Sequence, residues 1–267
     1  MRIPASISAI TDINAKYHDF LAPTIDTYQE QYHPKVLALY KDIFDRIFSF
    51  FKSKNKEKLS ILDVGCGTGY LEQFLQPEIN EIVGIDVSQK LLAKAKNKYP
   101  RVKYYLADIY KFKSRKKYDL IVENSVLHHL KDYEMVLAKM IYMLKFGGCL
   151  FLGDEPNYYA YRYLPFIKYL FRYHLQDKRK LKTADIRNKF EKHAEYHLFF
   201  SGGINPFKLK QYLSKRGLSN VYITFSSREF FASLIDRLGL YLVNYLPNFV
   251  LDSTGILSRM FYLTAFK

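Results

Sequence analysis

The sequence predicts an α/β fold in which helices cover an open sheet of mainly parallel strands and a ligand binds where the strands end. Three observations predict it. The apolar run Ile61–Val64 is followed by three glycines at alternate positions and then by a helical pattern. The short apolar strands that come next each end in an acidic residue. Strand and helix patterns alternate as far as residue 156, as they do in parallel sheets with helical crossovers.

The glycine loop, Gly65–Gly69, indicates what the first strand end would hold. Glycine is needed where the backbone turns with a positive φ, or where a ligand approaches with no Cβ in the way. A dinucleotide fold would show G-x-G-x-x-G, and a Walker loop would end in Gly-Lys-Ser/Thr. This chain has G-x-G-x-G, with Asp63 before it and no basic residue nearby. The loop therefore suits a cofactor that carries adenosine and a positive charge but no phosphate.

Acidic residues close the next strands at regular intervals. Glu81–Asp86 is read as the second strand, and the Asp86 carboxylate can accept hydrogen bonds from both hydroxyls of a ribose. Val102–Leu106 is read as the third, and Asp108 follows it where an acid could meet the adenine amino group. The next two strands are read at Tyr118–Glu123 and Cys149–Pro156. These residues all lie at carboxyl ends, where open α/β sheets bind ligands.

These residues resemble the class I S-adenosylmethionine-dependent methyltransferases, and most of all the small-molecule enzymes of the ubiquinone/menaquinone methyltransferase type. The resemblance covers roughly residues 60–156 and rests on the glycine motif, the second-strand acid, the V-L-H-H-L segment at 126–130 and the L-x-x-G-G turn at 144–148. It implies a Rossmann-like seven-stranded sheet in the order 3-2-1-4-5-7-6, with strand 7 antiparallel. Leu218–Phe225 and Met260–Phe266 are read as its sixth and seventh strands.

The resemblance also implies a binding site for S-adenosyl-L-methionine. The first strand end and the glycine loop would line the methionine part of the cofactor, and Asp86 would bind the ribose. Residues after the third strand would border the adenine, and the end of the fourth strand would close the pocket. The residues expected to bind the cofactor are Asp63, Gly65, Cys66, Gly67, Gly69, Tyr70, Asp86, Val87, Ala107, Asp108, Ile109, Asn124 and Ser125.

Two regions are expected along the chain. Residues 1–57 would form an N-terminal arm and a helix that cover the active site, and 58–267 the methyltransferase core, with cap insertions at about 158–200 and 227–259. The arm is predicted to be irregular as far as about residue 31, with one weak helical stretch around Tyr17 and Phe20. From Pro34 to Phe51, apolar residues recur at helical spacing and predict a helix over the core.

Polar residues mark where three further helices begin. Ser88 after the second strand and Asp132 after the fourth are predicted N-caps. Asn205-Pro206 opens another helix, which is expected to end at Gly217.

The two insertions are rich in Tyr, Phe and Leu with interspersed Lys and Arg. A cap of this composition over the strand ends would exclude water and shape an apolar pocket for the methyl acceptor. The spacing of the apolar residues in 230–238 is also compatible with an amphipathic helix at a membrane surface, so a peripheral membrane contact stays open.

The chain has a formal net charge of +15, and residues 157–267 contribute 18 Lys/Arg against 7 Asp/Glu, or +11 of it. A basic region of this kind can meet nucleic acid, anionic lipid or an acidic substrate, and it can equally be solvated lysine on helix faces. We favour nucleic acid less than a small-molecule partner.

Two cysteines form no disulfide framework and suggest a reducing compartment. The first residues, from Met1 to Pro4, lack the apolar core of a signal peptide. The longest uncharged apolar stretch, Leu238–Leu251, is too short to span a bilayer. We therefore expect a soluble cytoplasmic protein.

Methyl transfer from a sulfonium is an in-line displacement, which depends mainly on alignment and on exclusion of water. A base is needed only if the acceptor must lose a proton. The candidates for that catalytic role are His129, His128 and Tyr17, followed by His18 and Glu155. His193 and His197 have the i, i+4 spacing of metal ligands, but no further ligand is in view, so the sequence predicts no metal.

The favoured function is S-adenosylmethionine-dependent methylation of a small or lipid-like, partly apolar acceptor. Two alternatives stay open: an RNA or protein methyltransferase that uses the basic C-terminal half, and a cofactor-binding interaction module without catalysis. Amino-methylating nucleic-acid enzymes carry Asn/Asp-Pro-Pro-aromatic after strand four, where this chain has Glu123–Val126, and its cysteines do not lie where cytosine-C5 enzymes need one. The sequence does not indicate the acceptor's identity or the oligomeric state.

Overall fold

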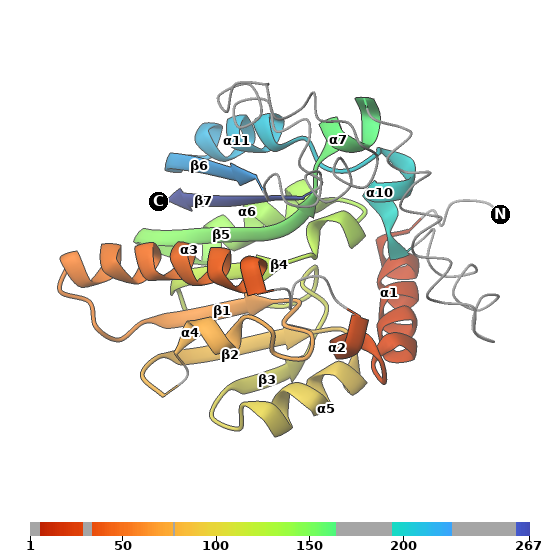
Figure 1. Cartoon of the computed structure of the whole chain (residues 1–267), viewed down its shortest axis with the longest axis horizontal. Coiled ribbons are helices and arrows are strands. Elements are labelled where there is room, and N and C mark those ends of the chain that lie inside the picture. Colours follow the sequence, from red (N-terminus) through yellow and green to blue (C-terminus); the bar gives the residue numbers. More distant parts are fainter. Residues whose placement is uncertain (1–5, 29–33, 77, 164–193, 226–259) are drawn as a thin grey trace.

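The structure is a computed structural model of the whole chain, and it describes residues 6–28, 34–76, 78–163, 194–225 and 260–267. A single sheet of seven strands runs through the middle of the molecule in the order β3-β2-β1-β4-β5-β7-β6 (Figure 1). Its strands are β1 (Ser60–Val64), β2 (Glu81–Asp86), β3 (Lys103–Leu106), β4 (Tyr118–Asn124), β5 (Leu144–Pro156), β6 (Ser219–Phe225) and β7 (Met260–Phe266).

The first five strands are parallel, and β7 lies antiparallel between β5 and β6. The predicted strand order and the antiparallel seventh strand are therefore confirmed. Because strands 1 to 5 are parallel, their carboxyl ends share one edge of the sheet, and the acids that close them meet there.

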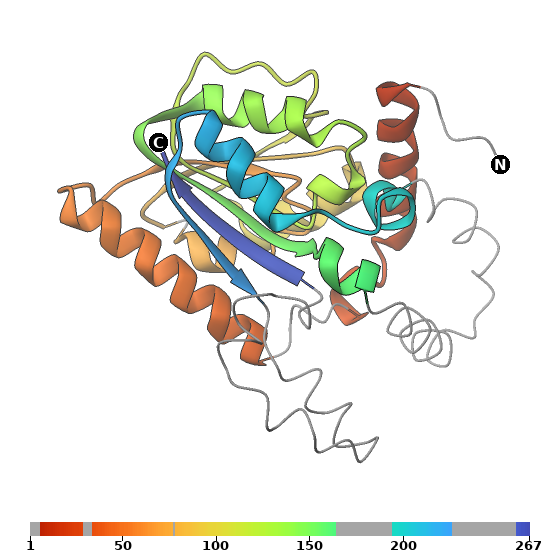
Figure 2. The same ribbon diagram turned by 90° about the horizontal axis from the view of Figure 1, so that it is seen from above.

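Helices cover both faces of the sheet, as Figure 2 shows from above. On one face, α3 (Pro34–Ser53), α4 (Glu72–Leu75) and α5 (Gln89–Lys98) enclose an apolar core that includes Phe44, Ile61 and Leu92. On the other, α6 (Tyr133–Met143) and α11 (Pro206–Lys215) enclose a second core that includes Leu62 and Leu137. The adjacent residues Ile61 and Leu62 serve opposite cores because successive side chains of a strand point to opposite faces.

The predicted helix starts are found at the expected residues. The Ser88 hydroxyl accepts from the N–H of Leu91, and the Asp132 carboxylate accepts from that of Met135. Asn205 caps α11 with its side-chain oxygen, and Gly217, at φ +85°, follows the end of that helix. Each cap satisfies N–H groups that the first turn leaves unpaired.

Two element boundaries differ from the sequence expectation. The N-terminal segment is not irregular: it forms α1 (Ile7–Leu21), capped by the Ser6 hydroxyl, and a short α2 (Ile25–Tyr28). Strand β5 begins at Leu144 rather than at Cys149, so the L-x-x-G-G segment that was expected to be a turn belongs to the strand. In that segment Gly147 N–H donates to the carbonyl of Lys267, so the end of the chain extends the pairing of β5.

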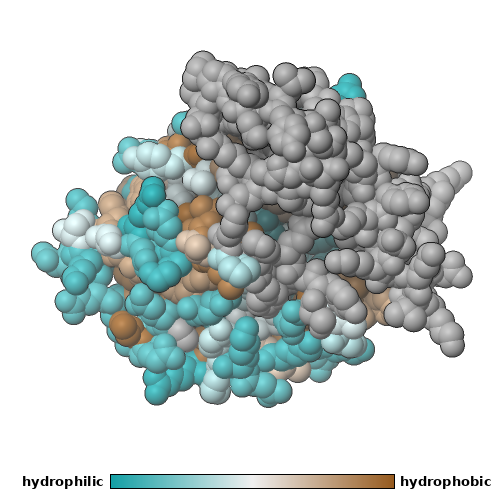
Figure 3. Space-filling view, in the orientation of Figure 1, coloured by the Kyte–Doolittle hydropathy of each residue, from teal (hydrophilic) through white to brown (hydrophobic). Residues whose placement is uncertain are grey.

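The predicted cap insertions fall largely on residues 164–193 and 226–259, outside the described residues, as does the predicted amphipathic helix around 230–238. The described parts of the first insertion are α7 (Tyr158–Tyr163) and α10 (Tyr196–Phe200). No helix among the described residues is both long and apolar enough to cross a membrane. The described surface seen in Figure 3 is mainly hydrophilic, with scattered apolar residues.

Candidate functional site

The candidate site lies at the edge of the sheet where β1, β2 and β4 end. Helix α1 stands across this edge, and α10 lies beside its upper end (Figure 1). Glycine-loop, acidic and imidazole groups from segments far apart in the sequence gather here, so the topology brings together most of the predicted site residues.

The glycine loop turns sharply after β1. Gly65, Gly67 and Gly69 have φ values of +70°, +55° and +80°, and the N–H groups of Gly65 and Cys66 donate to the carbonyl of Ile85 at 2.8 and 3.1 Å. A Cβ at Gly65 would lie 2.4 Å from the Val126 side chain, so that glycine is required by packing. A Cβ at Gly67 would meet no protein atom within 4 Å, so the loop presents an open surface there.

Asp86 fixes the loop from the end of β2. One carboxylate oxygen accepts from the Gly67 N–H at 2.9 Å and the other from the Ser88 N–H at 2.7 Å. Burial raises the pKa of Asp86, while His18 and these N–H groups oppose the rise. A carboxylate has about four lone-pair positions, so each oxygen can still accept from a ligand hydroxyl. Val87 follows Asp86 and is half-buried.

A pair of buried carboxyl groups, Asp63 and Glu72, lies beneath the glycine loop. Asp63 is 1% exposed and Glu72 is fully buried. Burial and the proximity of Glu72 raise the pKa of Asp63 well above its usual range, and burial raises the pKa of Glu72 to about 7. Tyr104 donates to one oxygen of Glu72 at 2.9 Å. Among the described residues, the second oxygen of Glu72 and one oxygen of Asp63 have no hydrogen-bond partner, which favours a positively charged ligand group nearby.

The three residues that follow β3, Ala107, Asp108 and Ile109, differ in their burial and in their contacts. The N–H of Ala107 donates to the Asp86 carbonyl at 2.9 Å and so continues the pairing of β3 with β2. Asp108 accepts from the Tyr110 N–H at 2.9 Å through one oxygen, and its other oxygen has no partner among the described residues. Ile109 is 5% exposed and belongs to the core beneath α6. Of these three residues, Asp108 is therefore the one with a side-chain oxygen that can still accept a hydrogen bond from a ligand.

Two predicted cofactor-binding side chains, Cys66 and Tyr70, are buried in the core on the α3 side. The Tyr70 ring packs edge-on against that of Tyr40 at 5.3 Å between centroids. At the end of β4, Asn124 accepts a hydrogen bond from the Tyr40 hydroxyl, and Ser125 has φ +63°. The strand end is therefore tied to α3, and the chain turns sharply after it.

The segment after Ser125 forms a short 3-10 helix, η2 (Leu127–His129), held by Glu155. The fully buried Glu155 carboxylate accepts from the N–H groups of Val126, Leu127 and His128 at 2.7 to 3.1 Å. Glu123 lies beside it, and burial together with Glu155 raises the pKa of Glu123 well above its usual range. Glu155 therefore acts here as a cap for the turn that carries both histidines.

The two histidines of η2 differ in charge because their partners differ. Nδ1 of His128 lies 3.0 Å from Glu155 and Nε2 lies 3.2 Å from Glu195. Burial acts to lower the pKa of His128, but the two carboxylates outweigh it and raise the pKa to about 10. His129 donates from Nδ1 to the carbonyl of Ala194 at 2.7 Å, and burial together with His128 lowers its pKa to about 3.

Helix α1 supplies the third predicted catalytic residue, Tyr17, which is 3% exposed. Its ring packs edge-on against His18 at 5.4 Å, and His18 packs edge-on against His129 at 4.9 Å. Asn14 donates from its amide to the carbonyl of His129 at 3.0 Å. Tyr17, His128 and His129 are thus brought into one cluster.

Two acidic residues of the arm hold it against the glycine loop and α5. Asp19 accepts from the Ser88 hydroxyl at 2.6 Å and from the Lys90 N–H at 3.1 Å. Asp26 accepts from the hydroxyl of Thr68, inside the glycine loop, at 2.7 Å and pairs with Lys94 at 3.0 Å. No sequence motif pointed to Asp19, Asp26 or Glu195. Only Glu72 carries a local signal, an acid in the first turn after the glycine motif.

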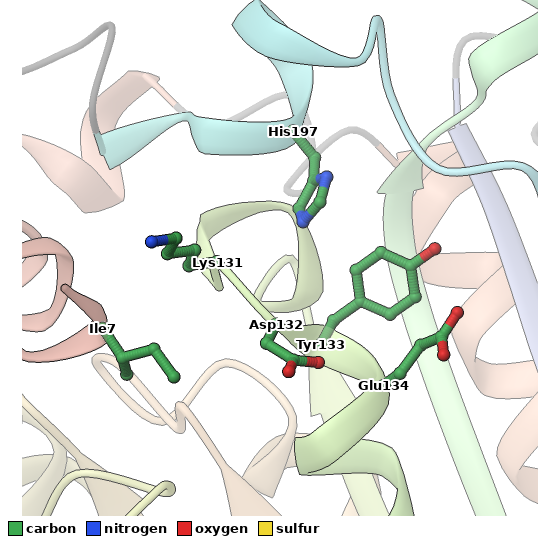
Figure 4. Close-up of a pocket in the computed structure, with 6 residues that line it drawn as sticks. All are labelled: Ile7, Lys131, Asp132, Tyr133, Glu134 and His197. Atoms are coloured by element: carbon green, nitrogen blue, oxygen red, sulfur yellow. The ribbon is translucent and has the colours of Figure 1, made fainter. Parts of the chain in front are cut away.

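A pocket of about 710 Å³ opens beside the histidine cluster. Figure 4 shows the residues that line it, from α1, the loop after η2, the start of α6 and α10. They are Ile7, Lys131, Asp132, Tyr133, Glu134 and His197. His197 is one of the two histidines with the i, i+4 spacing of metal ligands. It lines this pocket, and its ring centroid lies 4.9 Å from that of Tyr133. His193 lies outside the described residues.

Comparison with known proteins agrees with this fold. Residues 62–150 match a family model described as a methyltransferase domain. A malonyl-[acyl-carrier protein] O-methyltransferase from Hamiltonella defensa is 36% identical over 119 residues, which cover 44% of this chain and 45% of that protein. A ubiquinone biosynthesis O-methyltransferase from Pelagibacter ubique is 29% identical over 120 residues, which cover 42% of this chain and 50% of that protein. The chain thus spans half or less of the length of the curated relatives it matches.

A solved structure covers more of the fold. An N-methyltransferase from Bradyrhizobium japonicum, crystallised with S-adenosyl-L-homocysteine, superposes with a TM-score of 0.57 over 95% of this chain and 97% of that one, at 15% identity. At that identity the likeness concerns the fold. The predicted resemblance to class I methyltransferases is confirmed.

Proposed function

We propose that this chain is an S-adenosyl-L-methionine-dependent methyltransferase that acts on a small, partly apolar acceptor. One observation carries the proposal: the glycine loop presents an open surface at Gly67 between a backbone-fixed Asp86 and a buried Asp63–Glu72 pair with unpartnered oxygens. This arrangement provides an acceptor for hydroxyl groups and two carboxyl groups whose charged form a cationic ligand would stabilise, but no basic group for a phosphate. The named activities of the sequence relatives support the same reading.

The residues present fit the cofactor as follows. Asp86 would accept hydrogen bonds from the ribose hydroxyls, and Asp108, with its free oxygen, would meet the adenine amino group. The Asp63–Glu72 pair would favour the positively charged methionine part. The bound cofactor supplies an electrophilic methyl group on a sulfonium.

The acceptor would lie between the glycine loop and η2, beneath α1. Helix α1 would keep water out of this edge, and the fixed loop and turn would align the acceptor for in-line attack. Tyr17, His128 and His129 stay the candidates for a catalytic role there, and a proton acceptor is required only for an acceptor that must lose a proton. A small-molecule acceptor is favoured over nucleic acid because the relatives of this chain include enzymes named for small or carrier-bound substrates.

Methyl-labelled S-adenosylmethionine tests the proposal, with a panel of partly apolar small molecules that carry carboxylate, phenol or amine groups. We expect labelled product and stoichiometric S-adenosylhomocysteine with at least one class of acceptor. Binding of S-adenosylhomocysteine without turnover on any panel member would favour the non-catalytic module. Transfer only to RNA or protein would favour the other alternative.

A further inference from the structure

Two imidazoles and a carboxylate converge at the outer end of the η2 turn. One ligand atom each from His128, His129 and Glu195 lies within 4.8 Å of the others, and Nε2 of His128 is 3.2 Å from a Glu195 oxygen. Both histidines are at most 9% exposed. The third group comes from a segment more than sixty residues further along the chain, immediately before α10, so the fold and not local spacing assembles the set.

In both His128 and His129 the second ring nitrogen, Nδ1, already has a hydrogen-bond partner. Nδ1 of His128 contacts the Glu155 carboxylate at 3.0 Å, and Nδ1 of His129 donates to the Ala194 carbonyl at 2.7 Å. An imidazole that donates from Nδ1 keeps its lone pair on Nε2 when it is neutral. Histidines that bind metals almost always donate their second N–H to a carboxylate or a carbonyl in this way, which fixes ring orientation and raises ligand basicity.

Charge and distance both fit a divalent cation. Glu195 and Glu155 place two carboxylates on opposite sides of His128. A dication bound at Nε2 would replace the proton that the charged ring carries there, releasing it to solvent, and would balance both carboxylates. In a tetrahedral zinc site with bonds of about 2.1 Å, neighbouring ligand atoms lie about 3.4 Å apart. The distance of 3.2 Å between His128 Nε2 and the Glu195 oxygen already matches this value. A separation of 4.8 Å between two ligand atoms of the set would have to shorten by about 1.4 Å, which side-chain rotation can supply.

We propose that His128, His129 and Glu195 bind a divalent transition metal ion, with Zn²⁺ as the best match to two imidazoles and a carboxylate. The ion would tie the segment before α10 to the η2 turn at the methyl-transfer edge. Three protein ligands leave a coordination position for an oxygen atom from water or from another molecule. The proposed site differs from the metal-free expectation drawn from the sequence.

Metal binding can be measured without any methyl-transfer assay. Chelator-treated full-length protein is titrated with Zn²⁺ against a chromogenic indicator, and with Co²⁺ while its visible absorption is recorded. We expect one tight equivalent of Zn²⁺ and a Co²⁺ spectrum of a four- or five-coordinate site. His129→Ala and Glu195→Gln should each weaken Zn²⁺ binding by at least about 100-fold, because each removes a ligand that the other two cannot replace.

His197→Ala is the matched control, since His197 lies on α10 two residues from Glu195 but outside the set. It should retain the full affinity for Zn²⁺. Glu195→Gln keeps the shape of a side chain that is 20% exposed, so it remains informative if His129→Ala does not fold, and thermal melting identifies that case. Absence of a tight equivalent in the parent protein, or unchanged Zn²⁺ affinity in Glu195→Gln, would overturn the proposal.

Discussion

At Gly67 the backbone has φ +55°, and an added Cβ would meet no protein atom within 4 Å. Gly67→Ala should therefore cost only the left-handed backbone strain, about 1–2 kcal/mol of unfolding free energy. The new methyl group would project into the space assigned to the cofactor. We expect affinity for S-adenosylhomocysteine, measured by calorimetry, to fall tenfold or more, which is about 1.4 kcal/mol or more.

Gly147 provides the matched control for that substitution. Its φ is +71°, and an added Cβ there also meets nothing within 4 Å. Gly147 lies near the amino-terminal end of β5, away from the carboxyl ends of the strands that form the candidate site. Gly147→Ala should cost similar stability and leave the affinity unchanged. Equal affinity losses in the two variants would mean that the Gly67 surface is not the ligand surface.

The proposed cofactor site depends most directly on the carboxylate of Asp86. Asp86→Ala removes the acceptor for the ribose hydroxyls and also releases the Gly67 N–H. Loss of hydrogen bonds to a charged group should weaken S-adenosylhomocysteine binding by about 1.5–3 kcal/mol. Calorimetry should detect no NAD binding to either protein. Unchanged affinity in the variant would remove Asp86 from the site.

Asp119 gives a prediction about acid stability, independent of the ligand. Burial acts to raise the pKa of Asp119, but hydrogen bonds from Lys56, the Ser60 N–H and Lys145 outweigh it and hold the pKa below its usual range. A carboxyl with a depressed folded-state pKa stabilises the fold above its unfolded pKa, near 4, and loses that contribution as the pH falls toward the folded value. Asp119→Asn should therefore be less stable than the parent protein at pH 7.

Urea unfolding at pH 7, 4 and 3 tests this sign. The difference in unfolding free energy between the parent protein and Asp119→Asn should be largest at pH 7 and shrink below about pH 4. A difference that stays constant down to pH 3 would show that the charge of Asp119 is not its source.

Among the elements, the α1–α2 arm depends on a few polar contacts for its position. Asp19 and Asp26 form polar contacts with the glycine loop and with α5 and its N-cap; the partners are Thr68, Ser88, Lys90 and Lys94. A double variant, Asp19→Ala with Asp26→Ala, should loosen the arm while the two cores of the sheet stay intact. We expect increased proteolysis of the arm and a several-fold loss of S-adenosylhomocysteine affinity, with a small change in the urea midpoint.

The control for the arm is a pair of acids on the exposed face of α3. Asp42 and Asp45 make i, i+4 ion pairs with Arg46 and Lys41, and exposed pairs of this kind contribute about 0–1 kcal/mol. Asp42→Ala with Asp45→Ala should change neither proteolysis of the arm nor affinity. If both double variants behave alike, the arm does not hold the cofactor edge.

Elements with strong local signals were predictable, and elements that depend on distant contacts were not. Strand β7 was predicted with both ends correct, and the caps Ser88 and Asp132 mark their helices because capping is a local interaction. Helix α1 was predicted only as a weak stretch. Its buried side consists of Ile10, Asn14 and Tyr17. The Asn14 amide N–H donates to a carbonyl 115 positions away, a contact that no local pattern reveals.

The same distinction holds for the site. Glycine spacing and strand-end acids predicted which groups gather at one edge of the sheet, because both follow from the chain direction in a parallel sheet. Glu195 could not be predicted as a partner of His128, because the contact joins the turn after β4 to the last part of the first insertion, 67 residues further along the chain. Nor does the sequence distinguish Glu155 as a proton acceptor from Glu155 as the cap of η2, which the structure resolves as the cap.

At the scale of the whole molecule, one edge of the sheet collects three kinds of group. The glycine loop and its acids lie at β1 and β2, the η2 histidines follow β4, and α1 lies across both (Figure 1). The two apolar cores hold the strands in register, so the spacing between these groups is set by the sheet and not by loops. A transferring methyl group would have to sit between the first two sets.

A crystal structure of the chain with S-adenosyl-L-homocysteine tests this account most directly. We predict that the ribose hydroxyls contact the Asp86 carboxylate, that the ligand backbone passes over Gly67, and that the sulfur faces the η2 turn beneath α1. A ligand bound elsewhere, or one whose sulfur points away from η2 and α1, would contradict the assignment of this edge as the methyl-transfer site.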